Sequence, residues 1–170
     1  DAQQWLVASE QYYDDVLLID IGDPSLRELK QYFGPWPYTR DTYAVLLDYL
    51  TEMGAKTIIL DILLTDPREN DALLAEAIQR NRNTVLITSA PSDDAVSYHK
   101  ETEQLSPFAW QVPKTLPMTA WQSILTPVHV LTENSAAVLR LGMASVIEDK
   151  DGLLRRFPLM HYITGIALPS

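Results

Sequence analysis

The sequence predicts an α/β fold: a central, mostly parallel sheet in the order β-α-β-α-β, with helices on both faces and a C-terminal antiparallel hairpin. Three apolar runs at 16–21, 57–64 and 84–88 have the length and composition of strands. Helical patterns separate these runs, which favours parallel strands joined by right-handed crossovers. Further along, Asp151-Gly152 lies between two apolar runs and predicts the hairpin, because glycine tolerates a positive φ.

The first third of the chain contains one predicted strand and two predicted helices. Residues 16–21 are almost continuously apolar, the pattern of a strand covered on both faces. A turn at 22–25 leads into a short helix at 26–33. The clearest helix is predicted at 39–53, because its apolar residues recur at steps of three and four, and Gly54 ends it as a C-cap.

The remaining elements follow less regularly. After the strand at 57–64 we predict a helix at 71–81, whose leucine and alanine positions form an apolar stripe, and then the strand at 84–88. Four prolines and several polar runs interrupt the pattern, so we expect a long irregular excursion over about 91–126. Residues 128–139 are predicted to be helical.

The hairpin is predicted from the segments around the Asp-Gly pair. Residues 142–147 and 153–163 are apolar, and the polar stretch 148–152 lies between them. The acidic residues of that stretch resemble a fragment of a calcium loop, but Leu153 follows the glycine at once, where a calcium loop needs further ligands. A solvated hairpin tip is therefore the better interpretation.

Composition excludes several classes of function. The chain has 170 residues, 46% of them apolar and 21% charged, so we predict a single globular domain over 1–170. Its formal net charge of −10 argues against a nucleic-acid partner, because phosphate binding needs clustered cations. The same charge disfavours docking on anionic lipid. Cysteine is absent, which excludes disulfides, thiolate metal sites and a cysteine nucleophile.

Other features bear on where the chain belongs. No apolar run approaches the roughly 20 residues that cross a bilayer. The N-terminal residues lack the basic and apolar regions of a signal peptide. The final Pro169-Ser170 pair is typical of the opening of a helix, so we interpret the chain as an excised part of a longer protein.

Candidate binding residues gather where the first two strands are predicted to end. Asp20 and Asp61 occupy similar positions, and carboxylates at strand ends are common in α/β binding sites. They are suited to hold a divalent cation or to act as acid and base. The competing interpretation is that each accepts backbone N–H bonds and caps a neighbouring helix.

A Trp-Pro-Arg corner at 34–40 supplies further candidates. Trp36 offers an aromatic face and Arg40 a fork that binds carboxylates. The structural alternative, which we favour, is that Trp36 packs under the first crossover and Arg40 pairs with Asp20 or Asp61. The predicted lining of a ligand pocket is therefore Asp20, Asp23, Trp36, Arg40 and Asp61.

No catalytic, metal or cofactor motif is recognised. The three histidines lack the spacing of metal ligands, and no serine lies in a nucleophile elbow. The six glycines form neither a dinucleotide-binding nor a Walker pattern, so no cofactor is predicted.

Taken together, several ordered segments resemble the CHASE type-2 domain (cyclase/histidine-kinase-associated sensory extracellular domain). The resemblance covers most of the chain from Val16 onward and is weakest over 91–126. The matching segments are VLLIDIGDPSL (16–26), GPWPYTR (34–40), YAVLLDYLTEMGAKTIILDILLTD (43–66), NDALLAEAIQ (70–79), NTVLITSA (83–90) and LGMASVIEDKDGLLRRFPL (141–159).

The resemblance implies an extracytoplasmic sensor of a bacterial membrane receptor. Members of the family precede transmembrane helices and then a histidine kinase, a nucleotide or diguanylate cyclase, or a Ser/Thr kinase. The chain is then expected to have no catalysis of its own, to be tethered to the membrane through flanking helices, and to signal within a homodimer in response to a small molecule or protein. The family's ligands are mostly undefined, so no binding residue is carried over.

Two alternatives remain open at this stage. One is a metal-assisted hydrolase that uses Asp20 and Asp61. The other is a protein-docking module whose contact surface is the proline-rich segment 91–126.

Overall fold

A computed structural model describes residues 15–90, 102–113, 118–133, 135–146, 149, 151–155, 157–163 and 165–170. The chain divides into two compact units, Asp1–Pro37 and Tyr38–Ser170. The predicted α/β class is confirmed, with a parallel sheet and an antiparallel strand pair at the C-terminal end.

In the first unit the predicted strand at 16–21 is wrong. Residues 16–22 have no regular secondary structure, and Val16, Leu17 and Leu18 each expose at least 74% of their surface. An apolar run supplies strand propensity, but a strand also needs a hydrogen-bonded neighbour, and these residues belong to neither described sheet. The predicted helix that follows is confirmed as α2 (Asp23–Phe33), which begins three residues earlier than expected.

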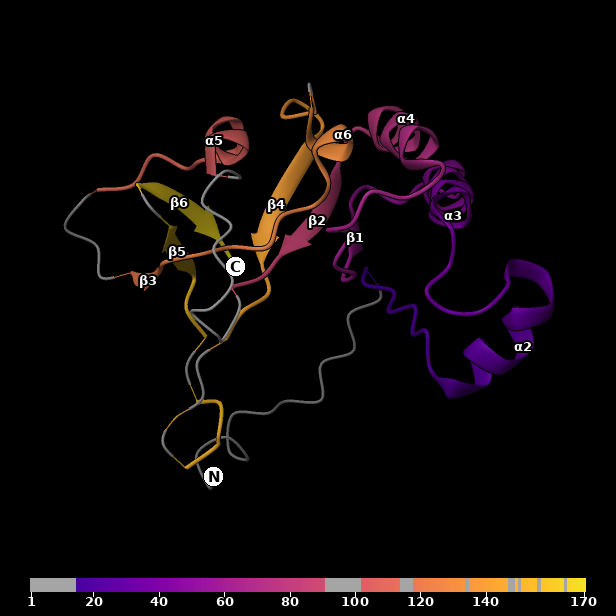
Figure 1. Cartoon of the computed structure of the whole chain (residues 1–170), viewed down its shortest axis with the longest axis horizontal. Helices are drawn as coiled ribbons and strands as arrows, with labels where there is room; N and C mark the ends of the chain where they lie inside the picture. Colours follow the sequence, from indigo (N-terminus) through magenta and orange to yellow (C-terminus); the bar gives the residue numbers. More distant parts are fainter. Residues whose placement is uncertain are drawn as a thin grey trace. The chain divides into compact units, whose positions relative to one another are not determined.

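The second unit contains the parallel sheet, in the spatial order β1-β2-β4 (Figure 1). Leu60 of β1 is paired with Leu86 of β2, and Leu86 with Leu141 of β4. The elements of this region are α3 (Arg40–Glu52), β1 (Ile58–Leu60), α4 (Asp71–Asn81), β2 (Thr84–Thr88) and β4 (Leu139–Met143).

The two long helices of this unit confirm the helical periods in the sequence. Helices α3 and α4 pack side by side, and their inward-facing leucines and isoleucine are fully buried, as Leu47, Leu74 and Ile78 show. Gly54 follows α3 with φ +90°, the left-handed conformation that ends a helix. The strand predicted at 57–64 is confirmed only in its first half, as β1.

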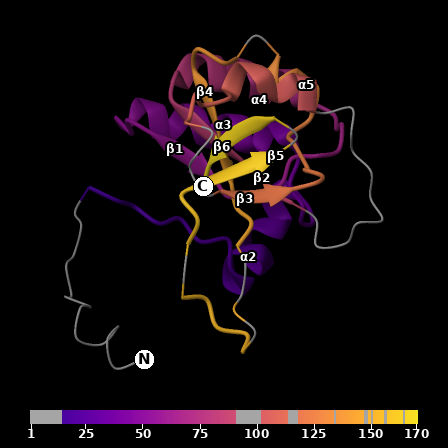
Figure 2. The same cartoon turned by 90° about the vertical axis from the view of Figure 1, so that its left-hand side faces the viewer.

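A second sheet has the order β3-β5-β6, and it was only partly expected. β3 (Thr119–Trp121) pairs in parallel with β5 (Met160–Ile163), which pairs antiparallel with β6 (Ile166–Pro169). Figure 2 shows β5 and β6 side by side with β3 next to β5. The C-terminal hairpin therefore exists, but it is formed by β5 and β6.

The hairpin predicted around the Asp-Gly pair is misplaced. A turn does form there, since Asp149 N donates to Leu153 O and Gly152 has φ +75°. Among the described residues, the segments on either side do not pair with each other, because both edges of β5 are occupied, one by β3 and the other by β6. Turn chemistry is local, whereas the strand partner is chosen by the whole sheet.

The segment between β2 and β4 is more ordered than its sequence suggested. It contains α5 (Thr102–Leu105), the 3₁₀ turn η1 (Ser106–Phe108) and β3, while 91–101 and 114–117 lie outside the described residues. The helix predicted at 128–139 is wrong beyond α6 (His129–Thr132), because β4 begins at Leu139.

Candidate functional site

Three of the predicted site residues belong to the first unit. Asp20 lies over Gly22, so that a Cβ added at that glycine would be 2.7 Å from Asp20 Oδ2. Asp23 is the first residue of α2, where a negative charge is favoured by the helix dipole. Trp36 is 44% exposed between its two prolines. A ligand-binding role for these residues stays a prediction.

Arg40 in the second unit is held in a buried ion pair, with 4% of its surface exposed. Its Nε donates to Asp71 Oδ1 at 2.7 Å, and its Nη2 donates to Asp66 O at 2.8 Å. Asp71 Oδ2 in turn accepts from the backbone N–H of Arg68 at 2.8 Å. These bonds join the first turn of α3 to the first turn of α4.

The expected ion pair of Arg40 is therefore present, but its expected partners were wrong. The partner of Arg40 is Asp71, in place of the expected Asp20 or Asp61. Asp71 was missed, although its place at the start of a strongly predicted helix was a usable signal. Asp61 follows β1 directly and is exposed.

The predicted pocket required two neighbouring strand ends, and 16–21 forms no strand. For the hydrolase alternative, the described residues contain no group of three or more histidine, cysteine, aspartate or glutamate side chains that could hold a metal. Binding at Asp61 remains a prediction, and no described geometry favours metal-assisted hydrolysis.

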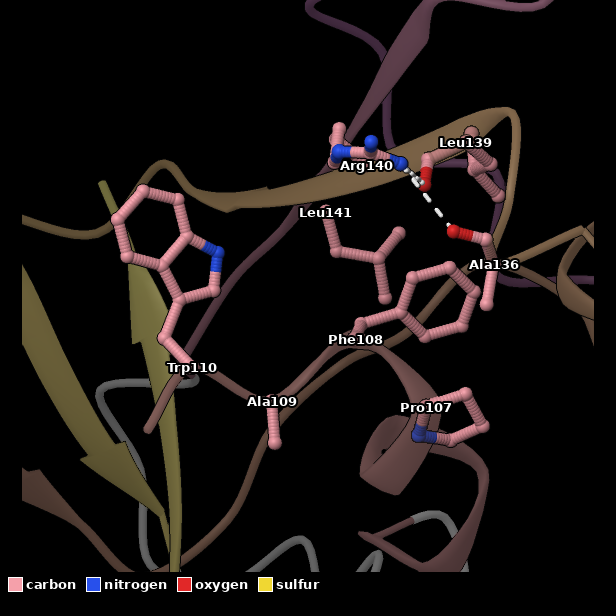
Figure 3. Close-up of a pocket in the computed structure, with 8 residues that line it drawn as sticks. All are labelled: Pro107, Phe108, Ala109, Trp110, Ala136, Leu139, Arg140 and Leu141. Carbon is pink, nitrogen blue, oxygen red and sulfur yellow. Dashed lines mark hydrogen bonds between the residues drawn. The ribbon is translucent and has the colours of Figure 1, made fainter. Parts of the chain in front are cut away.

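A different site is a cavity of about 130 Å³ between η1 and β4. Phe108, Leu139 and Leu141, which are almost fully buried, lie behind its inner wall, while Trp110 and Arg140 lie at its sides (Figure 3). Trp110 is 56% exposed, and its backbone N–H donates to Ala167 O of β6 at 2.9 Å. The lining residues are Pro107, Phe108, Ala109, Trp110, Ala136, Leu139, Arg140 and Leu141.

This cavity was not predicted from the sequence. Four of its residues come from the segment expected to be irregular, and the others lie in or just before a strand that was predicted as helix and hairpin. The only usable signal was an arginine between two leucines, which does not reveal which segment covers them.

A buried histidine organises the second sheet. Trp121 Nε1 donates to His161 Nδ1 at 2.8 Å, and the ring centroids are 6.1 Å apart. An indole N–H only donates, so Nδ1 accepts and the proton of neutral His161 resides on Nε2, 3.0 Å from Ser170 Oγ. Ser170 Oγ then donates to Pro158 O. Burial lowers the pKa of His161, which favours this neutral form.

The second unit thus combines a parallel sheet, a small cavity beside its edge strand, and a cation at the cavity. The family model of the CHASE2 domain matches residues 1–170, the whole chain. The chain therefore belongs to the CHASE2 family, a family of extracellular sensory domains of receptors. Neither the curated proteins nor the solved structures gave a significant match. Among the described residues, no helix is both long and apolar enough to span a bilayer.

Proposed function

We propose that this chain is the extracytoplasmic signal-sensing domain of a membrane receptor, such as a sensor histidine kinase or a nucleotide or diguanylate cyclase. Membership of the CHASE2 family over the whole chain is the observation that carries this proposal. The domain itself performs no catalysis. It binds a small-molecule or protein signal and passes that event across the membrane through flanking helices.

The mechanism is a shift between two receptor states. A signal that binds one arrangement of the domain better than the other stabilises that arrangement by the difference in binding free energy. The full receptor is expected to be a homodimer. A change in how its two sensory domains are arranged then moves the tethering helices of both subunits together.

The location can be tested with a single introduced cysteine, because the chain has none of its own. Glu76 of α4 is a suitable position, since 67% of its side chain is exposed. In the full-length protein with its other cysteines replaced, Glu76→Cys should react with a membrane-impermeant maleimide on intact cells. Labelling only after the cells are permeabilised would contradict an extracytoplasmic location.

The signalling role needs a separate measurement. Kinase or cyclase output of the full-length receptor should change when Arg40→Ala loosens the domain, and it should be unchanged in Arg82→Gln, a substitution at an exposed position. Equal output from the two variants, at equal protein levels, would contradict a role of this domain in controlling the output.

A further inference from the structure

We propose that the cavity between η1 and β4 binds a small monocarboxylic acid. In this proposal Arg140 and Trp110 hold the carboxylate, and the apolar body of the ligand lies against Pro107 and Phe108. The proposal rests on the sensory function above only for its biological role; the binding site stands on the geometry of the cavity itself.

The size of the cavity limits the ligand. Its volume is about 130 Å³. An apolar cavity of roughly 150 Å³ accommodates benzene. The part of the ligand that this half-open cavity encloses is therefore about the size of one six-membered ring or a short alkyl chain. Phe108, which is 8% exposed, is the side chain of the inner wall that a ligand can reach, because Leu139 and Leu141 are 0% and 2% exposed.

Arg140 supplies the charge. Both of its hydrogen bonds use Nη1, which donates to Ala136 O at 3.1 Å and to Leu139 O at 3.0 Å. These bonds hold the guanidinium beside the cavity and leave the donors of Nε and Nη2 for a ligand. No described carboxylate forms an ion pair with Arg140, although the chain as a whole carries a net charge of −10.

Two further donors point to the same ligand chemistry. Figure 3 shows the indole nitrogen of Trp110 on the side of the ring that faces Leu141, and no described residue accepts a hydrogen bond from it. In the β2–β4 ladder, Thr84 N donates to Val138 O and Ala144 N donates to Thr88 O. The backbone N–H and C=O groups of even-numbered residues in β4 therefore face β2. The N–H of Leu141 therefore points to the opposite edge of β4.

Donors of this kind select an acceptor. The lining contains an arginine, an indole N–H and a strand-edge N–H, but no acidic side chain. An amine would meet the charge of Arg140 with no carboxylate to balance it. A carboxylate, by contrast, offers two oxygens to the planar guanidinium fork. One carboxylate on a small apolar body satisfies both the charge and the volume.

The site can be tested by titrating benzoate and butyrate into the 170-residue chain and measuring heat and tryptophan fluorescence. We expect saturable binding to one site for at least one of the two acids. Arg140→Gln should weaken that binding at least 10-fold, and Arg140→Lys should weaken it less, because lysine keeps the charge but loses the fork. Benzyl alcohol, which has the ring but no charge, should bind at least 10-fold more weakly than benzoate.

The matched control is Arg82→Gln, which removes the same charge at an exposed position outside the cavity. It should bind the acids as the parent chain does, and thermal melting should show that each variant is folded. The proposal is overturned if neither acid binds saturably, if Arg140→Gln and Arg82→Gln have equal effects, or if benzyl alcohol binds as well as benzoate.

Failure of the site and failure of the sensory function are distinguishable. Acid binding that is lost in Arg140→Gln, with no response of the full-length receptor to the acid, supports the site and contradicts its role as the signal input. A receptor that depends on this domain but shows no acid binding supports the sensory function and contradicts the site.

Discussion

The two sheets of the second unit are built in different ways. The parallel sheet β1-β2-β4 takes two of its strands from the regular succession β1-α4-β2, and α4 buries Leu74, Ala77 and Ile78. The sheet β3-β5-β6 joins β3 to two strands that lie about forty residues further along the chain. Its strands are short, and a buried polar network of Trp121, His161 and Ser170 lies within it. Each sheet therefore combines two strands that are neighbours in sequence, β1 and β2 or β5 and β6, with one distant strand, β4 or β3.

The Arg40–Asp71 ion pair gives the sharpest test of the region around the parallel sheet. Arg40→Ala should lower the free energy of unfolding by about 3–5 kcal/mol, because it leaves the Asp71 carboxylate buried without its cation. Urea denaturation measures this change. The exposed Asp48–Arg80 pair joins the same two helices, so Arg80→Ala is the control and should cost far less, because water screens an exposed pair. Similar losses in the two variants would contradict the structural role of the buried pair.

Matched leucine truncations compare the two sheets directly. Leu74 of α4 and Leu168 of β6 are both fully buried, and truncation of either to alanine should cost about 2–5 kcal/mol. Since β4 packs against β6, we expect both variants to unfold in one transition seen by fluorescence and circular dichroism. Two separate transitions in either variant would show that the sheets are independent folding units.

The histidine network makes the stability of the sheet β3-β5-β6 sensitive to pH. Burial lowers the pKa of His161 in the folded chain. When the pH is below the ordinary pKa of histidine, the unfolded chain therefore binds a proton more readily than the folded chain does. The resulting stability is present above about pH 6.5 and is lost as pH falls through that value towards the folded pKa. The slope is at most about 1.4 kcal/mol per pH unit.

Denaturant melts between pH 7.5 and 5.5 check this expectation. His161→Gln should flatten the slope, whereas the control His129→Gln, at an exposed position of α6, should keep it. An unchanged slope in His161→Gln would assign the pH dependence to other groups.

The smallest expected change in stability concerns two turns, one after α3 and one between β5 and β6. Gly54 after α3 and Gly165 between β5 and β6 have φ of +90° and +100°, and a Cβ at either position would meet no atom within 4 Å. Alanine at each should therefore cost only the left-handed backbone strain, about 1–2 kcal/mol. Thermal melting with matched chemical denaturation measures both. A much larger loss at Gly165 alone would show that its turn controls the β5–β6 register.

The sequence by itself determined the α/β class, the helices α2, α3 and α4, and the strand β2. Each of these is encoded by a local period or by a short-range stop signal, which act within a few residues. The resemblance of ordered segments also sufficed to identify the CHASE2 family, which the family comparison confirmed.

Only the tertiary structure decided the rest. It showed that 16–21 forms no strand, that Arg40 pairs with Asp71, and that β4 joins the parallel sheet although its sequence suggested a helix and a hairpin. It also brought Trp110 and Arg140 to one cavity and Trp121 beside His161. Each of these outcomes depends on which distant segment supplies a hydrogen-bond partner or a covering side chain. Local propensity carries no information about that choice, because the competing partners have similar patterns and differ only in where the folded chain places them.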